Sequence, residues 1–368
     1  MQADHDNLRA ALAWAASSGA IESELRLAVN LTRFWWWRGL WSEGLTAMSR
    51  ALEWGQATGD GTLRVRALGP AGSYAALRGE FDKARKYHEE GLAIARGLAD
   101  RPLVSQLLGD LGRTEYLQGR YAAASAHFAE ALALFNQLDD QTRASNMIDS
   151  MGNAALELGD FVTARRHFVE CLRRSATSHP WSRAVALSHL SNVDFHEGRY
   201  QDARARCEES LAIYKATPEA RAMAMNGAQL GAVLFELDER AEGLAMLADS
   251  LSTLAKLGDR KGVSNAIGML TQAVARTPDP LTAARLWGAA ERLLEDWGIR
   301  ASPRAQRRLE AQVEAARAEA EDPEAFHREW QRGRQLDQAS AVRLALEAAG
   351  VARQEAGATS ACSAISGR

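Results

Sequence analysis

The sequence has few of the residues that mark disulfide-linked, metal-binding or strongly charged proteins. Its 368 residues include three cysteines, Cys171, Cys207 and Cys362, whose spacing matches neither a disulfide framework nor a zinc site. This cysteine usage favours a reducing cytoplasm. With 47 acidic and 44 basic residues the net charge is -3, so composition predicts no binding to nucleic acid or anionic membrane. The low count of eight prolines suits a helical chain.

Segments that would indicate targeting, membrane insertion or nucleotide chemistry are also missing. The first residues contain no basic stretch followed by an apolar one, so no signal peptide is predicted. The most apolar patch, residues 34–37, is interrupted by Arg38 and is too short to span a bilayer. Residues 258–262 are the nearest match to a phosphate-binding loop but lack the Gly-Lys-Ser/Thr order. No helix-turn-helix pattern with a basic recognition helix is present.

A repeat of 40 residues organises the chain. Five glycines spaced by 39 or 40 residues are each followed two positions later by an aromatic residue: Gly39, Gly79, Gly119, Gly159 and Gly198. A small residue five positions after each glycine extends the frame to seven copies: Gly44, Ala84, Ala124, Ala164, Ala203, Gly243 and Ala283. A period of this length is typical of a solenoid, in which each unit buries its apolar face against its neighbours.

Each unit is predicted to be two helices joined by a tight turn at the glycine, as in residues 103–117 and 121–138. A second small residue lies twelve positions before the first, so the two helices can cross closely. A larger residue follows four positions after the first and is predicted to fill the space between units. Residues 238–240 and 278–280 replace the glycine turn, and we interpret those units as degenerate repeats.

These patterns predict an all-α, right-handed superhelical solenoid of about seven helix pairs with a C-terminal helical cap. Residues 1–20 are expected to form a half-repeat helix whose partner helix is missing, as in a cut through a longer array. The array covers 21–298, and the cap covers 299–350 with helices at 303–320, 323–333 and 338–349. Residues 351–368 show no apolar period and are predicted to be a disordered tail.

The repeat resembles the tetratricopeptide repeat, with a period of 40 in place of 34. The residues that carry this resemblance are Leu111, Gly112, Gly119, Tyr121, Ala124, Phe128 and Ala131. Residues 4–15 and 33–39 near the start, with 286–291 and 326–334 near the end, resemble the sensor domains of bacterial signal-transducing ATPases, including MalT-like and LuxR-type transcriptional regulators.

That resemblance implies a non-catalytic module that binds a peptide, a protein or a small inducer in a concave groove. A constitutive scaffold or assembly adaptor is the alternative, and self-association is left open. The predicted groove residues share one face of the first helix of each unit: the donors Arg33, Arg113, Asn153, Asn192 and Gln272 and the aromatics Trp36, Tyr116, Phe195 and Phe235. The donors would hold carboxylates and backbone amides, and the aromatics would form pockets between them. Simple solvation of the groove explains the same residues equally well.

No catalytic or metal site is predicted, and no cofactor. His127 and His167 hold equivalent places in adjacent units, where the helices are too far apart for two imidazoles to share zinc. No nucleophile, base and orienting group can be argued from spacing. Three consecutive tryptophans begin at Trp35, so at least one must meet solvent, and packing against Trp14 is expected for the others.

Overall fold

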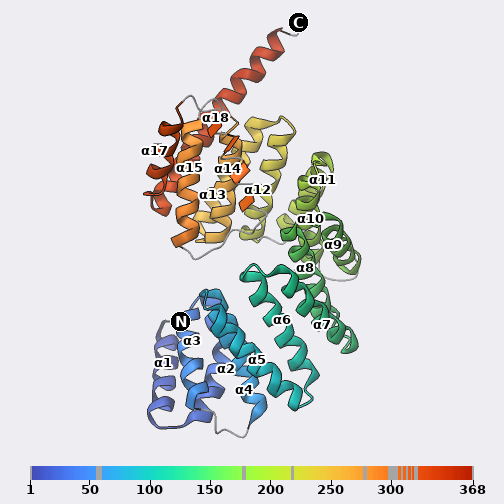
Figure 1. Cartoon of the computed structure of the whole chain (residues 1–368), viewed down its shortest axis with the longest axis vertical. Coiled ribbons are helices and arrows are strands. Elements are labelled where there is room, and N and C mark those ends of the chain that lie inside the picture. Colours follow the sequence, from blue (N-terminus) through green and yellow to red (C-terminus); the bar gives the residue numbers. More distant parts are fainter. Residues whose placement is uncertain are drawn as a thin grey trace. The chain divides into compact units, whose positions relative to one another are not determined.

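The computed structural model describes residues 2–54, 60–175, 180–216, 219–276, 280–296 and 322–366, together with eight helical positions between 306 and 318. Within these residues every regular element is an α-helix (Figure 1). The chain divides into two compact units, Met1–Ala154 and Ala155–Arg368, and each is described by itself. The prediction of an all-α array of helix pairs is confirmed.

The first unit is a succession of helices of similar length. They are α1 (Gln2–Ser17), α2 (Ile21–Arg38), α3 (Trp41–Trp54), α4 (Gly61–Leu77), α5 (Phe81–Gly97), α6 (Arg101–Leu117), α7 (Tyr121–Gln137) and most of α8 (Gln141–Leu158). The second unit continues with α9 (Phe161–Ser175), α10 (Pro180–His196), α11 (Tyr200–Ala216), α12 (Ala220–Glu236), α13 (Arg240–Lys256), α14 (Arg260–Val274), α15 (Pro280–Asp296), α17 (Pro323–Gly333) and α18 (Gln338–Ser366).

The period of 40 arises from helices of 17 residues followed by turns of three, as in α6 and α7. Gly119 has the left-handed φ of 83°, and the Arg120 amide donates to the Glu115 carbonyl at 2.8 Å, which closes the helix end. Asp238 takes φ 68° and the Glu239 amide bonds to the Leu234 carbonyl at 3.0 Å. The unit with Asp238 in place of glycine therefore keeps the same turn, since aspartate tolerates this conformation.

Paired small residues let the two helices of a unit cross closely, as predicted. A Cβ on Gly231 would lie 2.8 Å from the Gly243 carbonyl oxygen, and one on Gly72 would lie 2.3 Å from the His88 ring. The larger residue of each unit thus packs over the small residue of its own first helix. His88 also lies 3.3 Å from the Thr114 hydroxyl of the next pair, so it fills the space between units as well.

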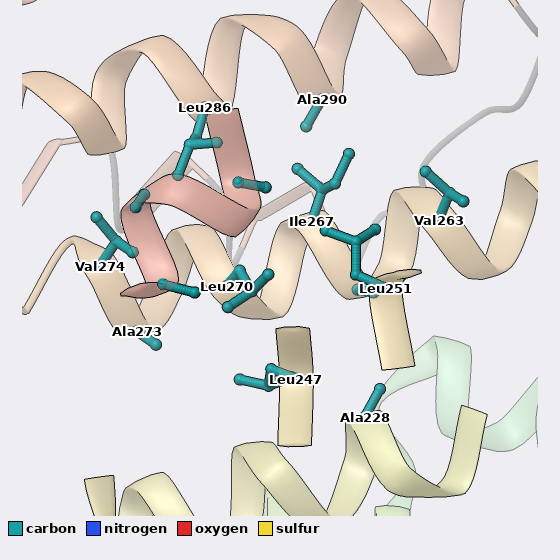
Figure 2. Packing of buried hydrophobic residues seen from close by; sticks show 14 of the residues in the cluster. Ala228, Leu247, Leu251, Val263, Ile267, Leu270, Ala273, Val274, Leu286 and Ala290 are labelled. Carbon is teal, nitrogen blue, oxygen red and sulfur yellow. The ribbon is translucent and has the colours of Figure 1, made fainter. Parts of the chain in front are cut away.

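A continuous apolar core runs through the C-terminal part of the second unit. Leu247 and Leu251 of α13 meet Ile267 and Leu270 of α14 and Leu286 of α15 (Figure 2). Alanines of α18, which packs mainly on α13, complete this core: Ala341, Ala345, Ala348, Ala349 and Ala352. The second cap helix, α17, packs on α15 through Trp287 and Phe326.

One expectation about the C-terminal end of the chain is wrong. α18 continues to Ser366, which contradicts the disordered tail predicted from residue 351. The segment is rich in alanine and lacks proline, and such a composition favours a helix even without an apolar face. Of the three consecutive tryptophans, Trp35 lies in the same core cluster as Leu12 of the first half-repeat, whereas Trp14 of that half-repeat is 67% exposed. The predicted cap helix at 303–320 lies mostly outside the described residues.

The prediction that one of the three tryptophans meets solvent is confirmed by Trp36, which is 42% exposed. In the described part of the chain no helix is long and apolar enough to cross a membrane.

Candidate functional site

A pocket of about 260 Å³ opens in the second unit where α10, α12 and α14 end. Its walls combine aromatic, aliphatic and charged side chains: Phe195, His196, Tyr200, Ala232, Phe235, Glu236, Leu247, Met269, Gln272, Ala273 and Arg276. Three of the residues predicted for the groove, Phe195, Phe235 and Gln272, are brought together here.

The repeat places these residues side by side. His196, Glu236 and Arg276 are each 40 residues apart, as are Phe195 and Phe235. Because consecutive first helices of a solenoid lie next to each other, equivalent positions form rows across them. The charged row was missed in the sequence. It could have been found by extending the predicted rows one residue further along each helix.

An ion pair lies in the pocket wall. The Arg276 guanidinium donates to the Glu236 carboxylate at 2.8 Å, and Arg276 is about half exposed. The same guanidinium lies 5.2 Å from the centre of the Phe235 ring, and that of Arg240 lies 5.7 Å from it. Two cations near one aromatic ring contribute cation–π attraction and hold the ring in place.

The opposite end of the lining is built from aromatic contacts. Phe195 meets Tyr200 edge to face with ring centres 5.7 Å apart. His196 stacks on Phe161 of α9 at 5.8 Å with an interplanar angle of 10°. These contacts fix two side chains at the end of α10 and one at the start of α11, so this wall is preorganised.

A buried carboxylate supports this wall from within the unit. Asp194, next to Phe195 in the sequence, is completely buried and accepts from Arg165 of α9 at 2.6 Å and from Arg199 at 3.0 Å. Arg206 of α11 also donates to Asp194. Burial, together with the nearby charge of Arg165, lowers the pKa of Arg206.

The first unit contains an equivalent of this cluster. Glu115 accepts from Arg120 and lies 3.3 Å from the Arg85 guanidinium. Burial acts to raise the pKa of Glu115, but the hydrogen bond and charge of Arg120 and the charge of Arg85 hold it below its usual value. Removal of one partner from such a buried pair is costly, so these clusters fasten successive helix pairs to each other.

The remaining predicted residues of the first unit lie outside any described pocket. Arg33 and Arg113 are exposed, and the Arg113 guanidinium lies 3.8 Å from Asp110. The Asn153 amide donates to the Asp149 carbonyl at 3.0 Å and to its carboxylate at 3.1 Å. Its donor is therefore already used within its own helix.

The two aromatic residues of this set contact neighbouring rings. Trp36 lies 6.3 Å from the Tyr74 ring centre, and Tyr116 meets Tyr121 edge to face at 5.2 Å. Asn192 is half-buried and belongs to the second unit. Arg113 and Asn153 belong to the first unit, so these two predicted donors and Asn192 do not lie in one unit.

Outside the pocket, the buried thiol of Cys207 has a structural role. Cys207 is completely buried beside the Ser191 hydroxyl at 2.9 Å, and burial raises the pKa of its thiol to about 12. A thiol of this kind is an inert core residue. Across the residues that the structure describes, no group of three or more His, Cys, Asp or Glu side chains could hold a metal ion.

Comparison with known families identifies the repeat. Models of the tetratricopeptide repeat match residues 65–137, 103–177 and 183–217. These parts of the chain therefore contain tetratricopeptide repeats, as the sequence pattern predicted. No curated protein sequence matches the chain.

Several solved structures share the fold at low sequence identity. A Rap protein complexed with competence and sporulation factor is 13% identical, with 88% of this chain and 86% of that chain covered and a TM-score of 0.59. NprR in complex with its cognate peptide NprX is 12% identical, with 84% and 87% covered and a TM-score of 0.59. BtubC from P. vanneervenii is 16% identical, with 60% and 92% covered and a TM-score of 0.51.

Proposed function

We propose that this chain is a non-catalytic tetratricopeptide-type module that binds an extended peptide, or a segment of a partner protein, with one side chain inserted in the pocket of the second unit. The observation that carries the proposal is the convergence of Phe195, Phe235 and Gln272 on that pocket. The fold is also that of NprR, whose structure was determined with a cognate peptide, and of a Rap protein bound to competence and sporulation factor.

The size of the pocket favours a side chain over a whole metabolite. Pockets for small ligands usually measure about 300 to 1,000 Å³, and this one is about 260 Å³. Polar atoms make up more of its lining than apolar ones, so the pocket suits a polar side chain that lies against the aromatic rings. Gln272 and the pair of Glu236 and Arg276 offer both donors and acceptors to the peptide backbone beside it.

The wider role that we propose is that of a sensor in a bacterial transcriptional regulator or signal-transducing ATPase of the LuxR or MalT type, located in the cytoplasm. The resemblance of residues 4–15 and 33–39 to such regulators supports this role. A small inducer in place of a peptide, and a constitutive scaffold in place of a sensor, are the alternatives that the test below separates.

The test is selection of binding peptides from a random library on the full chain, followed by affinity measurement with two variants. Arg276→Gln changes a pocket residue, whereas Arg240→Gln changes a second cation near Phe235 that does not line the pocket. We expect Arg276→Gln to weaken the selected peptides at least tenfold and Arg240→Gln to leave them within about twofold, since a lost charge-assisted hydrogen bond costs about 1.5–3 kcal/mol.

Equal affinities for both variants would contradict the proposed site. Binding that instead depends on Arg113 and Asn153 would move the site to the first unit. A chain that binds no peptide but does bind a small metabolite, or only an intact protein, would favour the inducer or the scaffold.

A further inference from the structure

Arg276 uses only one edge of its guanidinium in the pocket wall. Its Nη1 atom donates to the Glu236 carboxylate at 2.8 Å, and the guanidinium lies 5.2 Å from the centre of the Phe235 ring. The Nε and Nη2 atoms of a guanidinium form a fork that matches the two oxygens of a carboxylate. Within the residues that the structure describes, this second edge of Arg276 donates to no protein group. The Arg276 side chain is 50% exposed and lines the pocket, so a ligand can reach this edge.

Arg334 of the same unit shows a complete version of this arrangement. Its guanidinium lies 5.1 Å from the centre of the Trp330 ring, and its Nη1 atom donates to the Glu291 carboxylate at 3.3 Å. Its Nη2 atom donates to the two carboxylate oxygens of Glu295 at 2.9 Å and 2.7 Å. The Arg334 side chain is 25% exposed, half the value for Arg276. In this fold, one guanidinium beside an aromatic ring thus holds two carboxylates, whereas Arg276 receives only one from the protein.

Arg143 of the first unit shows that an exposed edge alone does not make a site. Its guanidinium lies 5.9 Å from the centre of the Phe135 ring, its Nη1 atom donates to Asp140 at 3.0 Å, and its side chain is 55% exposed. Asp140 and Arg143 are three residues apart, and no described pocket lies beside them. The pair of Arg276 and Glu236 instead joins two repeats in the wall of a pocket, and this difference defines the candidate.

The space beside Arg276 suits the rest of an acidic residue. Gln272 lies four positions before Arg276, about one helical turn, and both line the pocket. The rings of Phe195 and Tyr200 also line it and can pack against the methylene groups of a glutamate.

The charges around the pocket favour an anionic group over a cationic one. The guanidinium groups of Arg276 and Arg240 lie 5.2 Å and 5.7 Å from the centre of the Phe235 ring. Glu236 lines the pocket, whereas Asp238, the ion-pair partner of Arg240, is 82% exposed, so solvent screens its charge. A cationic side chain would therefore meet two guanidinium groups, while a carboxylate meets one carboxylate and gains the second edge of Arg276.

We propose that Arg276 is a carboxylate-binding residue, whose Nε and Nη2 atoms bind a carboxylate of the ligand while Nη1 stays on Glu236. The inference rests on the proposed function and specifies the chemistry of the inserted group. An aspartate or glutamate side chain and the C-terminus of a peptide both carry this group, and the experiment separates these two sources.

The first experiment passes four hexapeptide pools over the immobilised full chain and quantifies the retained fraction. Three pools have acetylated and amidated ends, random flanking positions, and glutamate, glutamine or lysine fixed at one central position. The fourth has central glutamine and a free C-terminal carboxylate. We expect the glutamate pool to be retained about tenfold more than the glutamine and lysine pools, as for a charge-assisted hydrogen bond.

Three variants test whether this preference comes from Arg276. Arg276→Gln should remove the preference, and the matched control Arg143→Gln should leave it unchanged, because Arg143 has the same contacts without a pocket. Glu236→Gln should raise the retention of the glutamate pool about threefold, because it removes the repulsion between two carboxylates. A pocket that binds a cation would instead lose affinity in this variant.

The second experiment uses a probe that does not depend on peptide binding. N-acetylglutamate amide is titrated into the full chain, and the side-chain Nε–H resonance of Arg276, assigned with Arg276→Gln, is followed by NMR. N-acetylglutamine amide is the matched control. We expect the carboxylate probe to shift this resonance and the amide probe to leave it in place.

The outcomes separate the carboxylate site from peptide binding itself. Equal retention of all pools, or a glutamate preference that Arg276→Gln does not change, would overturn the inference and leave peptide binding in place. A response of Arg276 to the carboxylate probe without retention of any pool would support the carboxylate site and contradict the peptide module. Neither response would overturn both proposals. Stronger retention of the fourth pool than of the glutamate pool would identify the peptide C-terminus as the source of the carboxylate.

Discussion

The crossing of α15 and α17 offers a sharp test of how this fold is packed. A Cβ on Gly288 of α15 would lie 2.0 Å from the Trp330 carbonyl oxygen, and one on Gly333 of α17 would lie 1.9 Å from that of Arg285. Side-chain carbons essentially never approach heavy atoms within 3.0 Å. Because the obstructing atoms are backbone, Gly288→Ala must separate the two helices by roughly 1 Å, which loosens tightly packed contacts.

The contacts at risk are those that hold α17 in place. Phe326 is buried with Trp287, the Trp330 indole donates to Glu291 at 3.0 Å, and Arg285 donates to Glu329 at 2.6 Å. Overpacking of a close contact costs typically 1–3 kcal/mol and occasionally more. We expect Gly288→Ala to destabilise the docked α17 by about 2–4 kcal/mol, which is about 30- to 1,000-fold in the opening equilibrium.

The assay is amide hydrogen exchange in α17, because units of a repeat protein open separately. Gly268 of α14 is the control: it also lies inside a helix, but a Cβ there would meet nothing within 4 Å. Gly268→Ala should stabilise its helix by about 0.5–1 kcal/mol, because alanine loses less backbone entropy. If Gly288→Ala also stabilised the chain, the close backbone crossing would be refuted.

Three further changes test other parts of the structure. Burial lowers the pKa of His88, so the imidazole binds a proton more readily in the unfolded chain than in the folded one. The stability of the fold should therefore fall as the pH drops below about 6.5. His88→Phe should reduce this dependence of stability on pH in denaturation curves taken between pH 7 and 5. Asp238→Gly should stabilise the α12–α13 turn by about 0.5 kcal/mol, whereas Asp238→Ala should destabilise it by about 1 kcal/mol in thermal unfolding, given its φ of 68°. Arg165→Met should lower the free energy of unfolding by about 3–5 kcal/mol, because the buried carboxylate of Asp194 loses one of its partners. A urea midpoint unchanged from the parent chain would count against a buried cluster.

The helical repeat could be predicted almost residue by residue, because its signals are local. Proline after Asp322 and the turn that follows Gly333 delimit α17, and the predicted range 323–333 matches the structure. The turn glycines and the small residues at the crossings recur at a fixed spacing, so each copy supports the interpretation of the others. Where local signals were weak, as after residue 350, the prediction was wrong.

The candidate site was predictable only in part. Phe195, Phe235 and Gln272 were found because they follow the repeat, but Arg113 and Asn153 follow it equally and line no described pocket. Whether a predicted residue lines a pocket depends on which side chains the neighbouring helices place beside it. The Asn153 amide donates to Asp149 of its own helix, whereas the Arg276 guanidinium donates to Glu236 of the preceding repeat.

The sequence by itself thus determined the fold class, the period, the turns and the rows of equivalent residues, because backbone conformation and close helix crossing depend on residues near each other in the chain. Only the tertiary structure decided which row forms a pocket and which carboxylate is buried among arginines. Each of these depends on contacts between side chains of different helices, whose burial and charge no single segment specifies.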